Sequence, residues 1–170
     1  MAAAIGRVES ATDELVATER VWRALGRASF AVLAHVTPRG EPRSSGVMYT
    51  VDGRRLYTVV AADSWKAKHI ALHPRVSVTV PVRRGGLLSL VFPIPPATVT
   101  FQAEATVHPA APLADLDVPR QLASLLPPDA QRTSRIIELR PVGEFVTYGI
   151  GVSLIAMRTP ARARGRASVS

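Results

Sequence analysis

The 170-residue sequence contains no cysteine. This absence excludes a disulfide framework, a thiolate nucleophile, a cysteine-ligated zinc site and an iron–sulfur cluster. No stretch approaches the roughly 20 consecutive apolar residues of a membrane-spanning helix. The first five residues are too few and too weakly apolar for a secretory signal, and acidic side chains follow at Glu9 and Asp13. We therefore expect a cytoplasmic protein.

Acidic residues are scarcer than basic ones, 13 against 21, and the formal net charge is +8. Half of this excess comes from four arginines near the C-terminus: Arg158, Arg162, Arg164 and Arg166. A basic tail can bind nucleic acid or anionic lipid through counterion release. However, the composition of residues 159–170 is more typical of a disordered, solubilising terminus. We predict one domain over residues 1–158 followed by this tail, and nucleic acid is not the expected partner.

Alternation of apolar and polar residues predicts a mainly β protein with about six antiparallel strands and three short helices. Short turns and the absence of long helices between the strands favour a small closed sheet over a doubly wound parallel one. The predicted strands cover residues 30–37, 43–51, 54–61, 75–82, 98–107, 136–140 and 144–157. The predicted helices cover residues 12–25, 64–72 and 112–126.

Motifs for catalysis by side chains alone are missing. There is no glycine-rich phosphate loop and no Gly-x-Ser-x-Gly elbow. Among the four histidines, only His69 and His73 share a helical face, and no third ligand accompanies them, so we do not predict a metal site. We nominate no catalytic residue, although Tyr49, Tyr148 and His35 could each donate a proton.

The segment 61–70 places the start of a predicted helix directly after a predicted strand. Ser64 offers a hydroxyl, the first helical turn offers free backbone N–H groups, and Lys66 adds a cation. Together these groups form a cradle suited to a phosphate. A structural reading is also open, in which Ser64 only caps the helix while Lys66 and Lys68 point to water.

Three features between residues 30 and 80 carry a resemblance to a known family. The first is a strand–turn–strand from Ala31 to Ser45, and the second is the hairpin from Val47 to Tyr57. The third is Asp63-Ser-Trp-Lys-Ala-Lys-His-Ile-Ala-Leu-His-Pro-Arg-Val-Ser-Val78. In this order and spacing they resemble the pyridoxamine-phosphate-oxidase-like superfamily of flavin- and deazaflavin-binding proteins.

The resemblance implies a six-stranded antiparallel split β-barrel with Greek-key topology and a homodimer with the cofactor at the subunit interface. The implied cofactor is FMN or the deazaflavin coenzyme F-420. The implied phosphate contacts are Arg43, Ser64 and Lys66. The implied contacts along the ring or the ribityl chain are Ser45, Gly46, Val47, Met48, Thr58 and Val59.

Two departures from the family pattern narrow these expectations. Trp65 stands where FMN oxidases of the family usually carry arginine, so a bidentate phosphate donor is lost and a deazaflavin becomes more plausible. The C-terminal tryptophan–arginine pair of true pyridoxamine-phosphate oxidases has no counterpart, and vitamin B6 oxidation is therefore not expected. The run from Tyr148 to Gly151 is similar to that of actinobacterial-type deazaflavin-dependent members.

The segment 87–96 is apolar and rich in proline. Its prolines are unfavourable in a central strand. If it forms a loop, its apolar surface must be buried against other residues, another chain or a lipid. We expect first that it packs in a dimer interface or in the core. A lid over an apolar substrate comes second, and membrane contact comes third.

The function predicted from this resemblance is a flavin- or deazaflavin-dependent oxidoreductase that transfers hydride to or from a small, apolar organic substrate. The alternative is a non-catalytic split-barrel protein that binds a cofactor, a lipid or haem. Neither the substrate nor the role of oxygen follows from the sequence.

Overall fold

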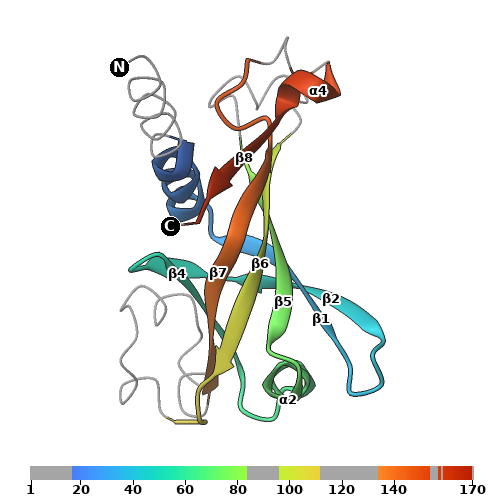
Figure 1. Cartoon of the computed structure of the whole chain (residues 1–170). Helices are drawn as coiled ribbons and strands as arrows, with labels where there is room; N and C mark the ends of the chain where they lie inside the picture. Colours follow the sequence, from blue (N-terminus) through green and yellow to red (C-terminus); the bar gives the residue numbers. More distant parts are fainter. Residues whose placement is uncertain (1–16, 84–95, 112–133, 154–156, 158, 170) are drawn as a thin grey trace, which may run out of the picture. The chain divides into compact units, whose positions relative to one another are not determined.

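The computed structural model describes residues 17–83, 96–111, 134–153, 157 and 159–169, which are coloured in Figure 1. The predicted helix over 112–126 and most of the apolar segment 87–96 lie outside the described residues. No helix in the described part of the chain is long and apolar enough to cross a membrane.

The described chain is mainly β, as predicted. Residues 17–27 are helical, and two further helices are α2 (Trp65–Leu72) and α4 (Pro160–Ala163). The strands are β1 (Phe30–Val36), β2 (Pro42–Met48), β3 (Thr50–Asp52), β4 (Arg55–Ala61), β5 (Arg75–Val82), β6 (Ala97–Val107), β7 (Ser134–Tyr148) and β8 (Arg164–Ser168). They form a sheet in the order β2-β1-β5-β6-β7-β4-β3, with β8 paired to β7.

The chain divides into two compact units, each discontinuous in sequence. Unit 1 comprises residues 1–28, 80–101 and 143–170, and unit 2 comprises residues 29–79 and 102–142. The strands β5, β6 and β7 contribute residues to both units.

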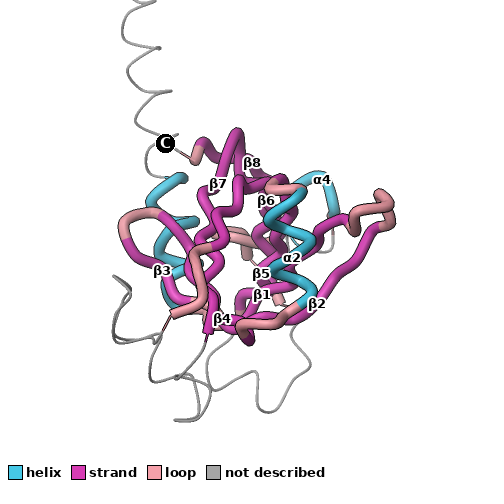
Figure 2. The backbone as a smooth tube through the Cα atoms, turned by 90° about the horizontal axis from the view of Figure 1, so that it is seen from below, coloured by secondary structure: helices cyan, strands magenta, loops and turns pink. Residues whose placement is uncertain are grey.

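The core of unit 2 follows from strand alternation. In β1, Ala31, Leu33 and His35 are buried while Phe30 and Val32 are exposed. The same period of two governs β5 and β6, whose alternate apolar residues are buried as predicted. The helix α2 contacts β1 and buries Ala67 and Ile70 (Figure 2).

The hairpin between β3 and β4 turns one residue later than predicted, because Asp52 pairs with Arg55 and the loop is Gly53-Arg54 instead of Asp52-Gly53. Gly53 and Arg54 both have positive φ, 52° and 60°. Two successive residues in this region form the tight turn whose twist matches antiparallel strands. The register that follows pairs Thr50 with Tyr57.

Unit 1 is built around an aromatic trio. The ring of Phe145 in β7 is fully buried and meets the rings of Trp22 and Phe101 edge-on, with centroid distances of 5.2 and 5.3 Å. Edge-to-face packing of this kind adds to the free energy gained by burying the rings.

The prediction of a disordered tail is wrong for residues 164–168, which form β8 and pair antiparallel with β7. Arginine alternates there with small residues, so the buried Ala167 lies opposite Phe145 while Arg166 points outward and ion-pairs with Glu144 at 3.0 Å. Thr18 donates a hydrogen bond from its hydroxyl to the carbonyl of Ser168 at 2.9 Å. The composition of this segment is typical of disorder, whereas its alternation with a period of two is typical of a strand.

The described residues therefore form eight strands, where the sequence predicted about six over seven ranges. The predicted strand 43–51 is divided at Tyr49 into β2 and β3, and the tail adds β8. The last two predicted strands are instead one long strand, β7, which ends at Tyr148. Gly149 and Gly151, both with positive φ, turn the chain after it.

Replacing Phe145 with alanine tests the aromatic trio. We expect Phe145→Ala to lower the free energy of unfolding by about 3–5 kcal/mol, because it removes both ring contacts and leaves a cavity. The neighbouring Val146 is 47% exposed, and Val146→Ala is the matched control, with an expected loss within about 0.5 kcal/mol. Urea unfolding measures both, and equal losses would contradict the role of the trio.

Candidate functional site

The turn between β1 and β2 sets the register of the candidate site. The hydroxyl of Thr37 accepts hydrogen bonds from the amides of Arg39 and Glu41, and Gly40 takes a positive φ of 81°. This turn pairs His35 of β1 with Arg43 of β2. Residues that are directly opposite in an antiparallel pair lie on the same face, so both side chains belong to the face that α2 contacts.

The helix α2 begins as the sequence predicts, with Ser64 at its N-cap. The hydroxyl of Ser64 makes no capping hydrogen bond, so the purely structural reading of this residue is not observed. The first intrahelical bond runs from the amide of Lys68 to the carbonyl of Ser64 at 3.2 Å. The amides that precede Lys68 in the first turn have no intrahelical acceptor, as at any helix start.

Lys66 lies in the first turn of α2 and is partly buried, whereas Lys68 is exposed. Burial lowers the pKa of the Lys66 ammonium group, because removal from water disfavours the charged form. Among the described residues, no carboxylate forms an ion pair with Lys66. Its charge is therefore available to an anion.

His35 is at the centre of the site. Its ring is 4% exposed and lies 5.9 Å from the Trp65 ring and 5.7 Å from the His69 ring, measured between centroids. Neither ring nitrogen of His35 has a hydrogen-bond partner among the described residues. Burial, then the charges of His69, Lys66 and Arg43, lower the pKa of His35. We refer to His35, Arg43, Trp65, Lys66 and His69 as the β1–α2 cluster.

The remaining predicted contacts lie on two strands. Ser45, Gly46, Val47 and Met48 are in β2, at the edge of the described sheet, and Thr58 and Val59 are in β4. The buried hydroxyls of Ser45 and Thr58 have no hydrogen-bond partner among the described residues. No described hydrogen bond, ion pair or ring contact joins Thr58 or Val59 to the β1–α2 cluster.

The exposed side of β2 is closely packed at one point. The Phe30 ring lies over Gly46, where an added Cβ would be 2.7 Å from the ring. Glycine therefore lets the Phe30 side chain rest directly on the β2 backbone. Val47, in contrast, is buried on the opposite side.

The β1–α2 cluster suits an anion rather than a metal cation. Arg43 and Lys66 carry positive charge, and the described carboxylate next to them is Glu41, which lies 3.4 Å from Arg43 on the exposed side. In the described part of the chain, no group of three or more histidine or acidic side chains could hold a metal ion. Cations together with unpartnered imidazole and hydroxyl groups match the acceptor oxygens of a phosphate.

The sequence patterns do not show that His35, Trp65 and His69 lie together, although two of these patterns bear on it. Alternation in β1 places His35 on the same face as the core residues Ala31 and Leu33, and four-residue spacing places Trp65 and His69 on one side of α2. The sequence does not show that this side of the helix packs on β1.

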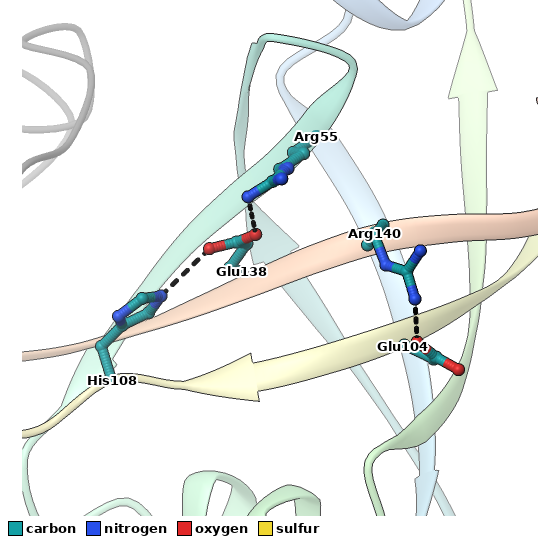
Figure 3. A network of polar contacts seen from close by, with 5 residues as sticks. All are labelled: Arg55, Glu104, His108, Glu138 and Arg140. Carbon is teal, nitrogen blue, oxygen red and sulfur yellow. Dashed lines mark hydrogen bonds and ion pairs between the residues drawn. The ribbon is translucent and has the colours of Figure 1, made fainter. Parts of the chain in front are cut away.

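A second polar network lies on β4, β6 and β7 (Figure 3). The Glu138 carboxylate accepts a hydrogen bond from Arg55 at 2.6 Å and lies 3.2 Å from Nε2 of His108. Arg140 forms a separate ion pair with Glu104. Because each described charge in this network has an opposite partner, it is better suited to holding strands together than to binding a ligand.

The comparisons with known proteins identify the family. The sequence profile of the pyridoxamine 5'-phosphate oxidase family matches residues 17–142. The chain belongs to this family. The matched region contains the whole β1–α2 cluster. Among curated proteins, the comparison found no significant match.

Solved structures show the split β-barrel fold of this family. An F420 reductase is 22% identical with a TM-score of 0.51, covering 72% of this chain and 93% of its own. An FMN-binding protein related to pyridoxamine 5'-phosphate oxidase, from Nostoc punctiforme, is 15% identical with a TM-score of 0.54, covering 89% and 85%. The haem storage protein HutZ of Vibrio cholerae is 13% identical with a TM-score of 0.58, covering 78% and 94%.

The lowered pKa of His35 makes a prediction about acid stability. Below the ordinary histidine pKa of about 6.5, the unfolded chain binds a proton at His35 that the folded chain resists. The free energy of unfolding should therefore fall as the pH drops below about 6.5, and His35→Phe should remove this part of the fall. Urea unfolding at several pH values measures it. The control His73→Gln should keep the wild-type dependence, and an unchanged pH profile in His35→Phe would contradict the assignment.

Proposed function

We propose that this chain is a flavin- or deazaflavin-dependent oxidoreductase that binds the phosphate of its coenzyme at the β1–α2 cluster. The observation that carries the proposal is the pair of cations, Arg43 and Lys66, beside a buried His35 whose ring nitrogens have no hydrogen-bond partner in the described part of the chain. Membership of the family, and the F420 reductase and FMN-binding protein among the similar structures, support a coenzyme of this class.

In this proposal each group has a defined task. Arg43, Lys66 and the Ser64 hydroxyl bind the phosphate, and the free amides in the first turn of α2 add donors. The residues Ser45 to Met48 lie along the ring, and Thr58 and Val59 lie beside the ribityl chain or the phosphate. The bound coenzyme supplies the hydride chemistry, and the protein supplies binding and orientation.

The residues present fit such a coenzyme in two respects. The buried hydroxyls of Ser45 and Thr58 have no partner among the described residues, and a polar ligand would satisfy them. The β2 strand lies at the edge of the described sheet, so one side of its backbone is free to offer N–H and C=O groups to the polar edge of a heterocycle.

Trp65 changes the character of the phosphate site. Where arginine would supply a fork of two donors, this chain has an indole ring, 54% exposed, that contacts His35 and His69. A site with fewer guanidinium donors binds a terminal phosphate less tightly. It therefore favours a coenzyme whose affinity depends less on contacts with a terminal phosphate. This difference supports a deazaflavin over FMN.

The second candidate is a non-catalytic binding protein of the same fold. The haem storage protein among the similar structures and the two adjacent imidazoles of the β1–α2 cluster, buried His35 and partly buried His69, favour it. An absorption spectrum of the purified protein, titrated separately with FMN, the deazaflavin coenzyme and haem, distinguishes the candidates. A flavin-type band that bleaches on reduction and recovers with an acceptor would indicate turnover, and binding of haem alone would contradict the oxidoreductase.

We also propose a homodimer. Phe30, Val32 and Met48 are 43%, 37% and 47% exposed and lie on one face of β1 and β2, as their register shows. Adjacent apolar residues at a sheet edge are typical of a surface that another chain covers.

Replacing Lys66 tests the phosphate site. We expect Lys66→Ala to weaken coenzyme binding by about 1.5–3 kcal/mol, the value of a hydrogen bond to a charged group, which is about ten- to a hundredfold in Kd. Lys68→Ala, on the exposed side of the same helix, is the matched control and should bind normally. Fluorescence titration measures both, and equal affinities would refute the assigned role of Lys66.

Replacing Val32 tests the homodimer. We expect Val32→Glu to raise the dimer dissociation constant by more than about tenfold, because a carboxylate would be buried without a partner. Leu72→Glu, at an apolar position of α2 that is 64% exposed, is the control and should leave the dimer intact. Analytical ultracentrifugation measures the oligomeric state. A wild-type protein that stays monomeric at high concentration would contradict the proposal.

A further inference from the structure

The buried imidazole of His35 is surrounded by positive charge. Arg43 faces it from β2, and Lys66 and His69 face it from α2, while the carboxylate of Glu41 is engaged with Arg43 on the exposed side. Trp65 lies beside the His35 ring. Among the described residues, the charged groups that shift the pKa of His35 are all basic, and none is acidic.

The hydrogen-bonding capacity of His35 is unused. A neutral imidazole has one N–H donor and one acceptor nitrogen, and both His35 nitrogens are buried without partners among the described residues. Leaving such groups unpaired in the interior is unfavourable. A metal ion would satisfy one nitrogen, but the charges of Arg43 and Lys66 would repel it. An anion would satisfy the N–H group and both cations together.

We propose that His35 is an additional contact of the anion bound at the β1–α2 cluster and that it takes up one proton from solvent when the anion binds. The inference rests on the proposed function, in which this anion is the phosphate of the coenzyme. No covalent bond changes. The proton adds to the free ring nitrogen, and the imidazolium donates a hydrogen bond to a phosphate oxygen.

The direction of the pH dependence follows from the charges. Without a ligand, burial and the neighbouring cations favour neutral His35. The negative charge of a bound phosphate opposes the field of the cations and favours the imidazolium, so binding and protonation each strengthen the other. Affinity should therefore rise several-fold as the pH falls from about 7.5 to about 6.5, above the range in which the phosphate group itself becomes protonated, near pH 6.

Proton uptake can be measured directly with three separate probes: oxidised FMN, the deazaflavin coenzyme, and phenyl phosphate, a monoester whose own second pKa lies at about 6. Calorimetric titrations of the wild-type protein near pH 7, in buffers of different ionisation enthalpy, report the protons bound per ligand. We expect a value approaching one for the wild type and for His73→Gln, and no uptake for His35→Gln. NMR of the wild-type histidine ring protons, before and after adding the probe, shows which ring becomes protonated without relying on a variant.

Each outcome decides between the two proposals. Uptake with phenyl phosphate and with either coenzyme that is lost in His35→Gln supports both. Coenzyme binding without proton uptake, or uptake lost in His69→Gln but kept in His35→Gln, overturns the role of His35 and leaves the coenzyme site standing. Uptake with phenyl phosphate but no binding of FMN or of the deazaflavin coenzyme supports the role of His35 and overturns the coenzyme assignment. Failure of all three probes to bind overturns both.

Discussion

The register between β1 and β2 is the constraint on which the candidate site depends. Seven residue pairs align these strands, and the pair of His35 with Arg43 lies next to the turn that sets the alignment. A shift by one residue would move His35 to the exposed face and leave α2 without its ring contacts. The hydrogen bonds that the Thr37 hydroxyl accepts from the amides of Arg39 and Glu41 therefore help to position the site, although none of these residues belongs to the cluster.

The β1–α2 cluster combines two kinds of interaction that usually compete. Its rings pack as aromatic groups do, with Trp65, His69 and His35 within 6 Å of one another between centroids. Its charges, in contrast, are all of one sign, and both ring nitrogens of His35 have no hydrogen-bond partner among the described residues. Polar groups that are buried but incompletely paired are unfavourable for folding alone and are typical of sites organised for a ligand. The described charges around Glu138 are instead paired, and this contrast is the reason for proposing the β1–α2 cluster as the binding site.

The residues that the family resemblance singles out lie close together, although their role as a phosphate site stays a prediction. Ser64 and Lys66 do begin α2, and Arg43 does face the same histidine as Lys66. Trp65, the departure from the expected pattern, has its indole ring beside His35 and His69.

Local periodicity determined most of the secondary structure: the alternation of β5 and β6 and the start of α2 are evident in the sequence, and the hairpin at Gly53 is evident to within one residue. Alternation also encoded β8, but the small residues of that strand gain their burial only against Phe145, which lies about twenty residues earlier in the sequence. The grouping of His35 with Trp65 and His69 likewise required the tertiary structure. Sequence patterns show which face of an element is apolar or polar, whereas the partner of that face depends on packing between elements that are distant in the chain.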